Sequence, residues 1–322
     1  MVKYLFRRIL MTLPVLLLVS LLVFGIGCMV PGDSAAALLG PEAAPADLLA
    51  LREKMGLNLS PPRRYLRWAL GLLRGDLGLS TGSGLPVAEL LAGRLAPTFS
   101  LALFSLILSV LGAVPLGLVA ALRKGGPADL GCSLAALAGI SVPSFLLGLF
   151  LILVFAVRLR WFPAAGYVPL SLGLGPHLRS IALPGIALAL MYGALLMRIT
   201  RSSFAGELGR DYVRFARAKG AGELVLALRH ALPNALPPLL SVLGQGFIGA
   251  LSGAAVVESV FGIPGLGALV AVSVARRDLP VIQAVVLLFV LMNQILNVLV
   301  DLTAALADPR LVLDGAPEGG GA

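Results

Sequence analysis

Residues 211–238 read DYVRFARAKGAGELVLALRHALPNALPP and lie between two long apolar segments. Two sets of side chains recur at helical spacing from just before this stretch into it. The apolar set is Leu208, Tyr212 and Phe215, and the basic set is Arg210, Arg214 and Arg217. Gly220 and Gly222 break this helix, and Glu223 begins a second short apolar helix that ends before Pro233. The segment predicts a compact basic helix–turn–helix on which a partner docks. A solvated loop that only anchors orientation is the alternative.

The composition makes the membrane the expected solvent of this chain. Of its 322 residues, 58% are hydrophobic and only 13% are charged, which exceeds what a water-soluble domain of this size needs. The net charge is +9, but the basic residues stand at the ends of apolar runs, where they set topology and meet anionic headgroups. We therefore expect membrane lipid as a partner and no nucleic acid.

The apolar runs predict an all-α polytopic membrane protein with six transmembrane helices. Six stretches reach the roughly 20 residues that a helix needs to cross a bilayer, near 9–30, 98–122, 130–157, 181–200, 236–257 and 280–301. The first run is longer than the core of a signal peptide, about 7–15 residues, so we expect a retained span. A shorter patch, Leu266–Val274, predicts a short helix at the far surface. Pro143 and Pro184, in the third and fourth spans, are interpreted as helix kinks rather than binding sites.

Charge in the short loops predicts the orientation. The N-terminus carries basic residues and no acid, and residues 198–229 carry seven basic and three acidic residues. The loop 123–129 falls on the same side, which is cytoplasmic by the positive-inside rule. The basic loop 158–179 indicates the opposite orientation, but the three segments on the other side outweigh it. Both termini are then inside.

The same pattern divides the chain into four parts. They are the N-terminal tail and first transmembrane helix at 1–30, an extracytoplasmic cap loop at 31–97, a five-helix transmembrane core at 98–310 with the basic segment at 201–235, and a disordered tail at 311–322. Two short amphipathic helices are expected inside the cap, within 41–58 and 61–78.

Several chemistries are excluded by residue type. The two histidines, His177 and His230, are too few for a zinc-protease helix or a histidine metal cluster, and His177 is interpreted as a solvated loop residue. None of the four lysines follows a glycine, so a phosphate loop is absent. Cys28 and Cys132 have neither metal nor redox spacing and are interpreted as packing residues. We expect no catalytic residues, metal or cofactor in this chain.

Polar residues within the spans are few. Asn293, Asn297 and Asp301 share one helical face at i, i+4 and i+8 in the sixth span. They line a translocation path or hydrogen-bond neighbouring helices, and the sequence leaves both open. Glu258, at the outer end of the fifth span, is open between a gate and a helix cap. All four are candidates for the translocation path.

The basic segment resembles the cytoplasmic coupling loop of binding-protein-dependent ABC importer permeases. The family pattern there is EAA, three residues, Gly, nine residues, then I-x-Leu-Pro. Gly220 and Leu232-Pro233 fall at the matching places, the triplet appears as Arg214-Phe215-Ala216, and His230 stands where isoleucine is usual.

The forms ARAKG and RHALPNAL are similar to those of the dipeptide/oligopeptide/nickel branch. Further stretches that resemble this branch cover nearly the whole chain: YLFRRIL, RYLRW, GISVPSF, WFPAAG, LMRITRSSF, VVESVFGIPGLG, RRDLPVIQAVVL and the terminal DPR. With its long loop after the first span, the chain resembles the first of the two homologous permease subunits in this branch.

This resemblance implies a type I ABC importer permease fold in a prokaryotic plasma (inner) membrane, N-in and C-in. It implies a heterodimeric pore with a homologous second permease subunit, two ATP-binding subunits that hold ATP and Mg, and an extracytoplasmic substrate-binding protein. Peptides are the commonest cargo of the branch, with nickel, glutathione-like molecules and sugars carried by relatives.

The resemblance also implies roles for residues of the loop. The expected ATPase-coupling residues are Asp211, Ala216, Arg217, Ala218, Lys219, Gly220 and Glu223. The apolar set Leu208, Tyr212 and Phe215 is expected to brace the first helix against the spans. Two other classes stay open: a stand-alone ion-coupled secondary transporter, disfavoured by the charge-poor spans, and an intramembrane enzyme, for which no nucleophile and base pair up.

Overall fold

The computed structural model describes residues 2–29, 34–39 and 44–307 of the chain. Within these ranges the regular structure is helical, and the elements follow one another as α1 (Val2–Met29), α2 (Ser34–Leu39), α3 (Pro45–Met55), α4 (Pro61–Leu73), α5 (Val87–Leu122), α6 (Pro127–Ser141), α7 (Ser144–Leu151), α8 (Leu174–Leu208), α9 (Asp211–Ala218), α10 (Glu223–Val225), α11 (Leu232–Val260), α12 (Leu266–Arg276) and α13 (Leu279–Ala307). The tail at 311–322 lies outside the described residues.

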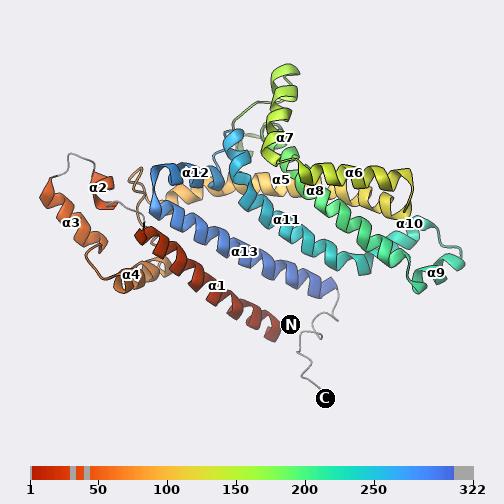
Figure 1. Cartoon of the computed structure of the whole chain (residues 1–322), viewed down its shortest axis with the longest axis horizontal. Helices are drawn as coiled ribbons and strands as arrows, with labels where there is room; N and C mark the ends of the chain where they lie inside the picture. The colour runs from red at the N-terminus through yellow and green to blue at the C-terminus, as the bar shows by residue number, and fades with distance from the viewer. Residues whose placement is uncertain (1, 30–33, 40–43, 308–322) are drawn as a thin grey trace, which may run out of the picture.

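Five helical segments of the described chain are long and apolar enough to cross a membrane, and a bent pair supplies a sixth. The five are Leu10–Met29, Val87–Leu122, Leu174–Leu208, Glu223–Val260 and Leu279–Val300. The predicted all-α fold with six spans is confirmed. Figure 1 shows α1, α11 and α13 side by side, with α9 and α10 at one end and α3 and α4 at the other.

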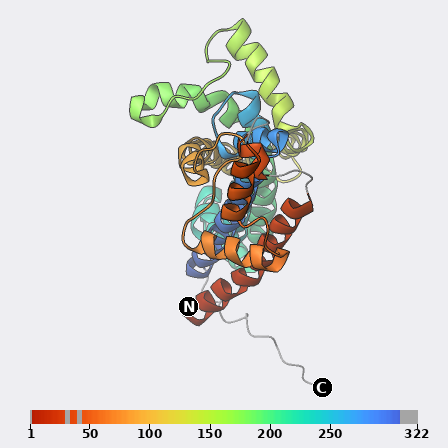
Figure 2. The same cartoon turned by 90° about the vertical axis from the view of Figure 1, so that its left-hand side faces the viewer.

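The third span is broken rather than straight. Residues Pro127–Ser141 and Ser144–Arg158 meet at an angle of 98°. Val142 is extended at φ −90° and ψ 121°, as a residue before proline prefers, and Pro143 cannot donate a backbone hydrogen bond. The second half therefore projects from the bundle (Figures 1 and 2). The expected kink at Pro143 is confirmed, whereas Pro184 stays inside the continuous helix α8.

Helix α8 forms the centre of the bundle, because it packs against α5, α6, α7 and α11. Small residues permit the close approach to α5. A Cβ on Gly117 would lie 2.7 Å from the carbonyl oxygen of Met197 and 2.7 Å from the Cβ of Thr200. Close contact at small residues is how helices associate in a membrane, where apolar surface alone gives little drive.

Asp278 joins the loop between α4 and α5 to the start of α13. Its carboxylate accepts hydrogen bonds from the Ser80 hydroxyl, from Thr81 N at 3.0 Å and from Gly82 N at 3.2 Å. Since Asp278 is buried and lies 198 positions from Ser80, this contact fixes where the chain enters the core after the cap. The helices predicted in the cap and at Leu266–Val274 are present as α3, α4 and α12.

Two expectations for single residues are wrong. His177 is 5% exposed rather than solvated, because it lies in the first turn of α8, with Nδ1 2.7 Å from the carbonyl oxygen of Val168 and its ring against Tyr167. Cys28 is exposed rather than packed, and both cysteines are free thiols.

Candidate functional site

Helix α8 ends at Leu208, and two non-helical residues separate it from α9, which begins at Asp211. Arg210 is extended at φ −71° and ψ 152°, so the helix restarts at Asp211. Asp211 stands in its first turn and Arg217 in its last, the arrangement that the helix dipole favours. Asp211 also pairs with Arg214 at 3.5 Å, but the pair is exposed and contributes little stability.

The residue that anchors α9 is Val213. It is 0% exposed and packs with Leu208, Phe204 and Leu226 in one apolar cluster. Phe215, expected to brace the helix, is 64% exposed. The expectation for Phe215 is wrong because the break before α9 resets the helical phase, so a face counted from α8 does not continue into α9.

Tyr212 fastens α9 through its hydroxyl rather than through apolar packing. The hydroxyl donates to the Glu207 carboxylate at 2.7 Å and accepts from the Asn234 amide at 2.9 Å. Burial, and then the hydrogen bond to Glu207, raise the pKa of Tyr212 above its usual value of 10.0. One side chain thereby joins α8, α9 and α11.

A tight turn follows α9 and is closed by an ion pair. Gly220 has φ +88°, in the left-handed region that only glycine adopts readily. The Arg217 guanidinium donates two hydrogen bonds to the Glu223 carboxylate, at 2.8 and 3.0 Å. Three of the expected coupling residues, Arg217, Gly220 and Glu223, therefore form one structural unit.

The outer surface of this turn is apolar at its centre and charged at its edge. Phe215, Leu224, Val225 and Leu228 are all exposed, and the Lys219 ammonium lies 4.5 Å above the Phe215 ring. Ala216 is partly buried against the apolar cluster, while Ala218 is exposed. This surface lies at the end of the bundle in Figure 1. An apolar centre with a charged edge is the arrangement found in protein–protein docking sites.

The sequence predicted that the second helix ends before Pro233, and this prediction is wrong. Residues Glu223–Val260 form one continuous helical segment. A wider π-helical stretch at Leu226–Ala231 precedes Pro233, and such a stretch changes the hydrogen-bond register where proline lacks a donor. The docking surface is therefore rigidly continuous with the fifth span.

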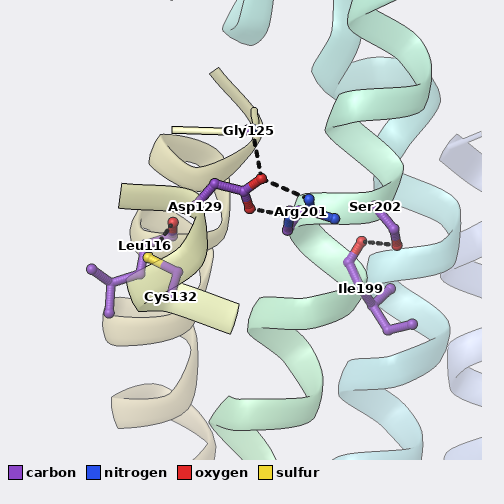
Figure 3. A network of polar contacts seen from close by, with 7 residues as sticks. All are labelled: Leu116, Gly125, Asp129, Cys132, Ile199, Arg201 and Ser202. Atoms are coloured by element: carbon purple, nitrogen blue, oxygen red, sulfur yellow. Dashed lines mark hydrogen bonds and ion pairs between the residues drawn. The ribbon is translucent and has the colours of Figure 1, made fainter. Parts of the chain in front are cut away.

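An ion pair joins the first turn of α6 to α8. The Asp129 carboxylate accepts from Gly125 N at 2.9 Å and from both Arg201 Nε and Nη2, the latter at 2.7 Å. Figure 3 shows the carboxylate between these two partners. No local sequence pattern indicates this pair, whose members lie 72 positions apart.

We expect Asp129→Asn and Arg201→Gln each to lower the melting temperature of the purified chain in detergent, since each leaves the other side chain without its partner. The double variant should lower it by less than the sum of the two single effects, because both remove one shared interaction. Additive losses would contradict the pairing.

The polar face of the sixth span is internally hydrogen-bonded. The Asn297 amide donates to Asn293 Oδ1 at 2.6 Å, and both residues are half-buried. The side chain of Asp301 lies outside the described ones. The role of this face in a translocation path stays a prediction.

Glu258 is fully buried in a network that joins three helices. Its carboxylate accepts from the Thr98 hydroxyl at 2.7 Å and from Ala268 N at 2.9 Å, while Thr98 Oγ1 accepts from Leu266 N at 2.8 Å. These backbone N–H groups are the unpaired donors of the first turn of α12. The arrangement favours the helix-cap interpretation of Glu258 over the gate.

We expect Glu258→Ala to lower the free energy of unfolding by about 2 kcal/mol or more, because Thr98 and Ala268 N lose their acceptor in a buried site. Glu258→Gln keeps one acceptor oxygen and should cost less. Thermal unfolding of the two variants in detergent measures the difference, and equal stability of Glu258→Ala and the parent would contradict the cap.

A cleft of about 750 Å³ opens near the outer end of the bundle. Its lining includes Phe99, Ser100, Leu103, Tyr167, Phe247 and Pro264. Its walls come from α5, α11 and two loops, so sequence spacing offered no signal for the cleft. The four candidates for the translocation path, Asn293, Asn297, Asp301 and Glu258, are not among the residues that line it. Among the described residues no group of three or more His, Cys, Asp and Glu side chains gathers as a metal site.

Two family models together match most of the chain. Residues 113–313 match the inner membrane component of binding-protein-dependent transport systems, and residues 1–102 match the N-terminal region of such membrane components. The chain belongs to this family. It is a multi-pass membrane subunit of a transport system, as the resemblance implied.

Curated relatives are similar over almost the full length of this permease. It is 40% identical to a probable peptide ABC transporter permease of Sinorhizobium fredii, covering 96% of this chain and 98% of that protein. It is 38% identical to a putative peptide transport permease of Brucella suis, covering 98% and 100%. A glutathione transport permease of Pectobacterium atrosepticum is 40% identical, with 97% and 99% covered.

Solved structures agree in fold. A methionine ABC transporter in an inward-facing conformation matches with a TM-score of 0.56 at 18% identity, over 68% of this chain and 96% of that chain. The permease thus has the fold of ABC importer membrane subunits.

Proposed function

We propose that this permease forms half of the pore of an ATP-driven importer for di- or oligopeptides. The similarity to curated peptide permeases over nearly the whole chain carries this proposal. A glutathione permease is equally similar in sequence, and glutathione is itself a modified tripeptide. Nickel or another small solute is the alternative cargo within the same mechanism.

The proposed partners are a homologous second permease, two ATP-binding subunits that hold ATP and Mg, and an extracytoplasmic substrate-binding protein. ATP hydrolysis is assigned to the ATP-binding subunits and not to this chain. The segment 31–97 is proposed to lie on the extracytoplasmic side of the membrane as a cap.

The proposed coupling surface is the turn between α9 and α10. The observation that supports this assignment is the exposed apolar patch of Phe215, Leu224, Val225 and Leu228. The patch stands on a turn closed by the ion pair of Arg217 and Glu223. The expected coupling residues stand on or beside it: Asp211, Ala216, Arg217, Ala218, Lys219, Gly220 and Glu223. Because Glu223–Val260 is one helical segment, movement of a docked ATPase is transmitted directly to the fifth span.

The proposed solute path includes the polar face of Asn293, Asn297 and Asp301. The half-buried position of both asparagines is compatible with this role. Their mutual hydrogen bond is equally compatible with a structural role, and a changed cargo range in Asn297→Ala separates the two.

The test is uptake of a labelled peptide into cells or vesicles that carry this permease with its co-purifying partners. We expect uptake to need ATP and to survive dissipation of the proton gradient. Uptake that follows the proton gradient without ATP would support the ion-coupled alternative. Mass spectrometry of the purified complex should then identify the partner subunits and a bound peptide, and a bound metal ion would overturn the cargo.

A further inference from the structure

Helix α4 packs across the side of α1 rather than beyond its end. The ring centroids of Tyr65 and Trp68 lie 5.4 and 5.5 Å from that of Phe24, and the Tyr65 hydroxyl lies 2.8 Å from the Ser20 hydroxyl. Figure 2 shows α4 crossing α1. Ser20 precedes the end of the span at Met29 by about 14 Å at the rise of a helix, and Phe24 by about 7 Å. With Met29 taken as the outer end of the first span, these distances correspond to the depth of the outer-leaflet acyl chains.

The polar atoms in this contact are satisfied without water. The Ser20 hydroxyl donates to the carbonyl oxygen of Leu17 at 2.8 Å, so its only proton is used. The Tyr65 hydroxyl therefore donates to Ser20. Such a closed set suits a water-free site, where a hydroxyl without a partner is costly.

The free faces of α4 differ in chemistry. Leu66, Leu70 and Leu73 follow at i, i+4 and i+7, share one face and are 59%, 52% and 85% exposed. Arg63 stands at the edge of this face, three positions before Leu66 and seven before Leu70. Arg64 stands on the side of α1, with its guanidinium 5.8 Å above the Phe24 ring. The sequence of α4, PPRRYLRWALGLL, holds three arginines and no acidic residue.

We propose that α4 is an interfacial helix inserted in the outer leaflet of the bilayer. Its leucine face lies against acyl chains, and Arg63 at the edge of that face contacts lipid phosphate. Interfacial helices sink about 5–10 Å below the headgroup boundary, which matches the depth of Phe24 on α1. The contact with α1 places the leucine face below the level that a soluble binding protein reaches, so lipid is its occupant. Tyr65 and Trp68 stand where aromatic residues anchor proteins at the interface.

Nitroxide labels test this arrangement in the full chain with its partners, reconstituted in vesicles that contain phosphatidylglycerol. Cys28→Ser and Cys132→Ser remove the free thiols, and Leu66→Cys or Leu70→Cys adds one label. Leu49→Cys is the matched control, because Leu49 is also 59% exposed but belongs to α3, which Figure 1 shows beyond the outer end of α1. Collision with oxygen, which partitions into acyl chains, is compared with collision with a water-soluble nickel chelate.

We expect the oxygen-to-nickel ratio at positions 66 and 70 to exceed that at position 49 severalfold. Arg63→Glu should lower the ratio at position 66, since an acidic side chain repels phosphate and lifts the helix. Labels at 66 and 70 that are open to the nickel chelate, or shielded from both reagents by protein, would overturn the insertion. An unchanged ratio in Arg63→Glu would overturn the phosphate contact.

Discussion

Replacement of Gly220 by valine is expected to abolish peptide uptake while the chain still inserts in the membrane. Nothing lies within 4 Å of a Cβ built at this position, so the change creates no collision. The backbone at φ +88° is the obstacle, because a side chain in the left-handed region costs about 1–2 kcal/mol. Relief of that strain should move Glu223 away from Arg217 and distort the coupling surface, so that uptake falls to the level of cells without the permease.

Gly222 supplies the matched control for this prediction. It also has open space around its Cβ position, but its φ is −68°. Gly220→Ala should therefore reduce uptake and Gly222→Ala should leave it near the parent value, at equal amounts of chain in the membrane. Equal uptake by the two alanine variants would contradict a role for the turn at Gly220 in coupling.

Val213→Asp is expected to prevent stable folding of the cytoplasmic end of the bundle. The side chain is completely buried among apolar residues, and an unpaired carboxylate there costs about 3 kcal/mol or more. Size-exclusion chromatography of the detergent-extracted variant should show aggregated or lost protein.

Phe215→Asp gives the contrasting result. Because Phe215 is 64% exposed, its replacement should leave a monodisperse chain but weaken capture of the ATP-binding subunits. Normal capture by Phe215→Asp would contradict the docking surface, and normal folding of Val213→Asp would contradict the anchor.

Local sequence signals predicted the parts of this structure that depend on neighbours in the chain. The six apolar runs, the break at Pro143, the short helix near Leu266 and the turn at Gly220 all follow from periodicity, proline and glycine. The phase of α9 was predicted wrongly because helical spacing was counted through Arg210, where the backbone is extended.

Contacts between distant segments could not be predicted in this way. Thr98 and Glu258 lie 160 positions apart, and Ser80 and Asp278 lie 198 apart, yet each pair is buried and hydrogen-bonded. A charged residue at the end of an apolar run has the same sequence pattern whether it caps a helix or lines a path. Only the packed helices distinguish the two for Glu258.

The most direct test of the account is site-specific photocross-linking from Leu224, which is 60% exposed on the coupling surface. A photoreactive amino acid at this position, in the full transporter, should cross-link to an ATP-binding subunit. The same amino acid at Leu170, 58% exposed near the outer end, is the control and should not. Cross-links at Leu224 that lead only to other proteins, in cells that retain ATP-dependent uptake, would contradict the proposed coupling.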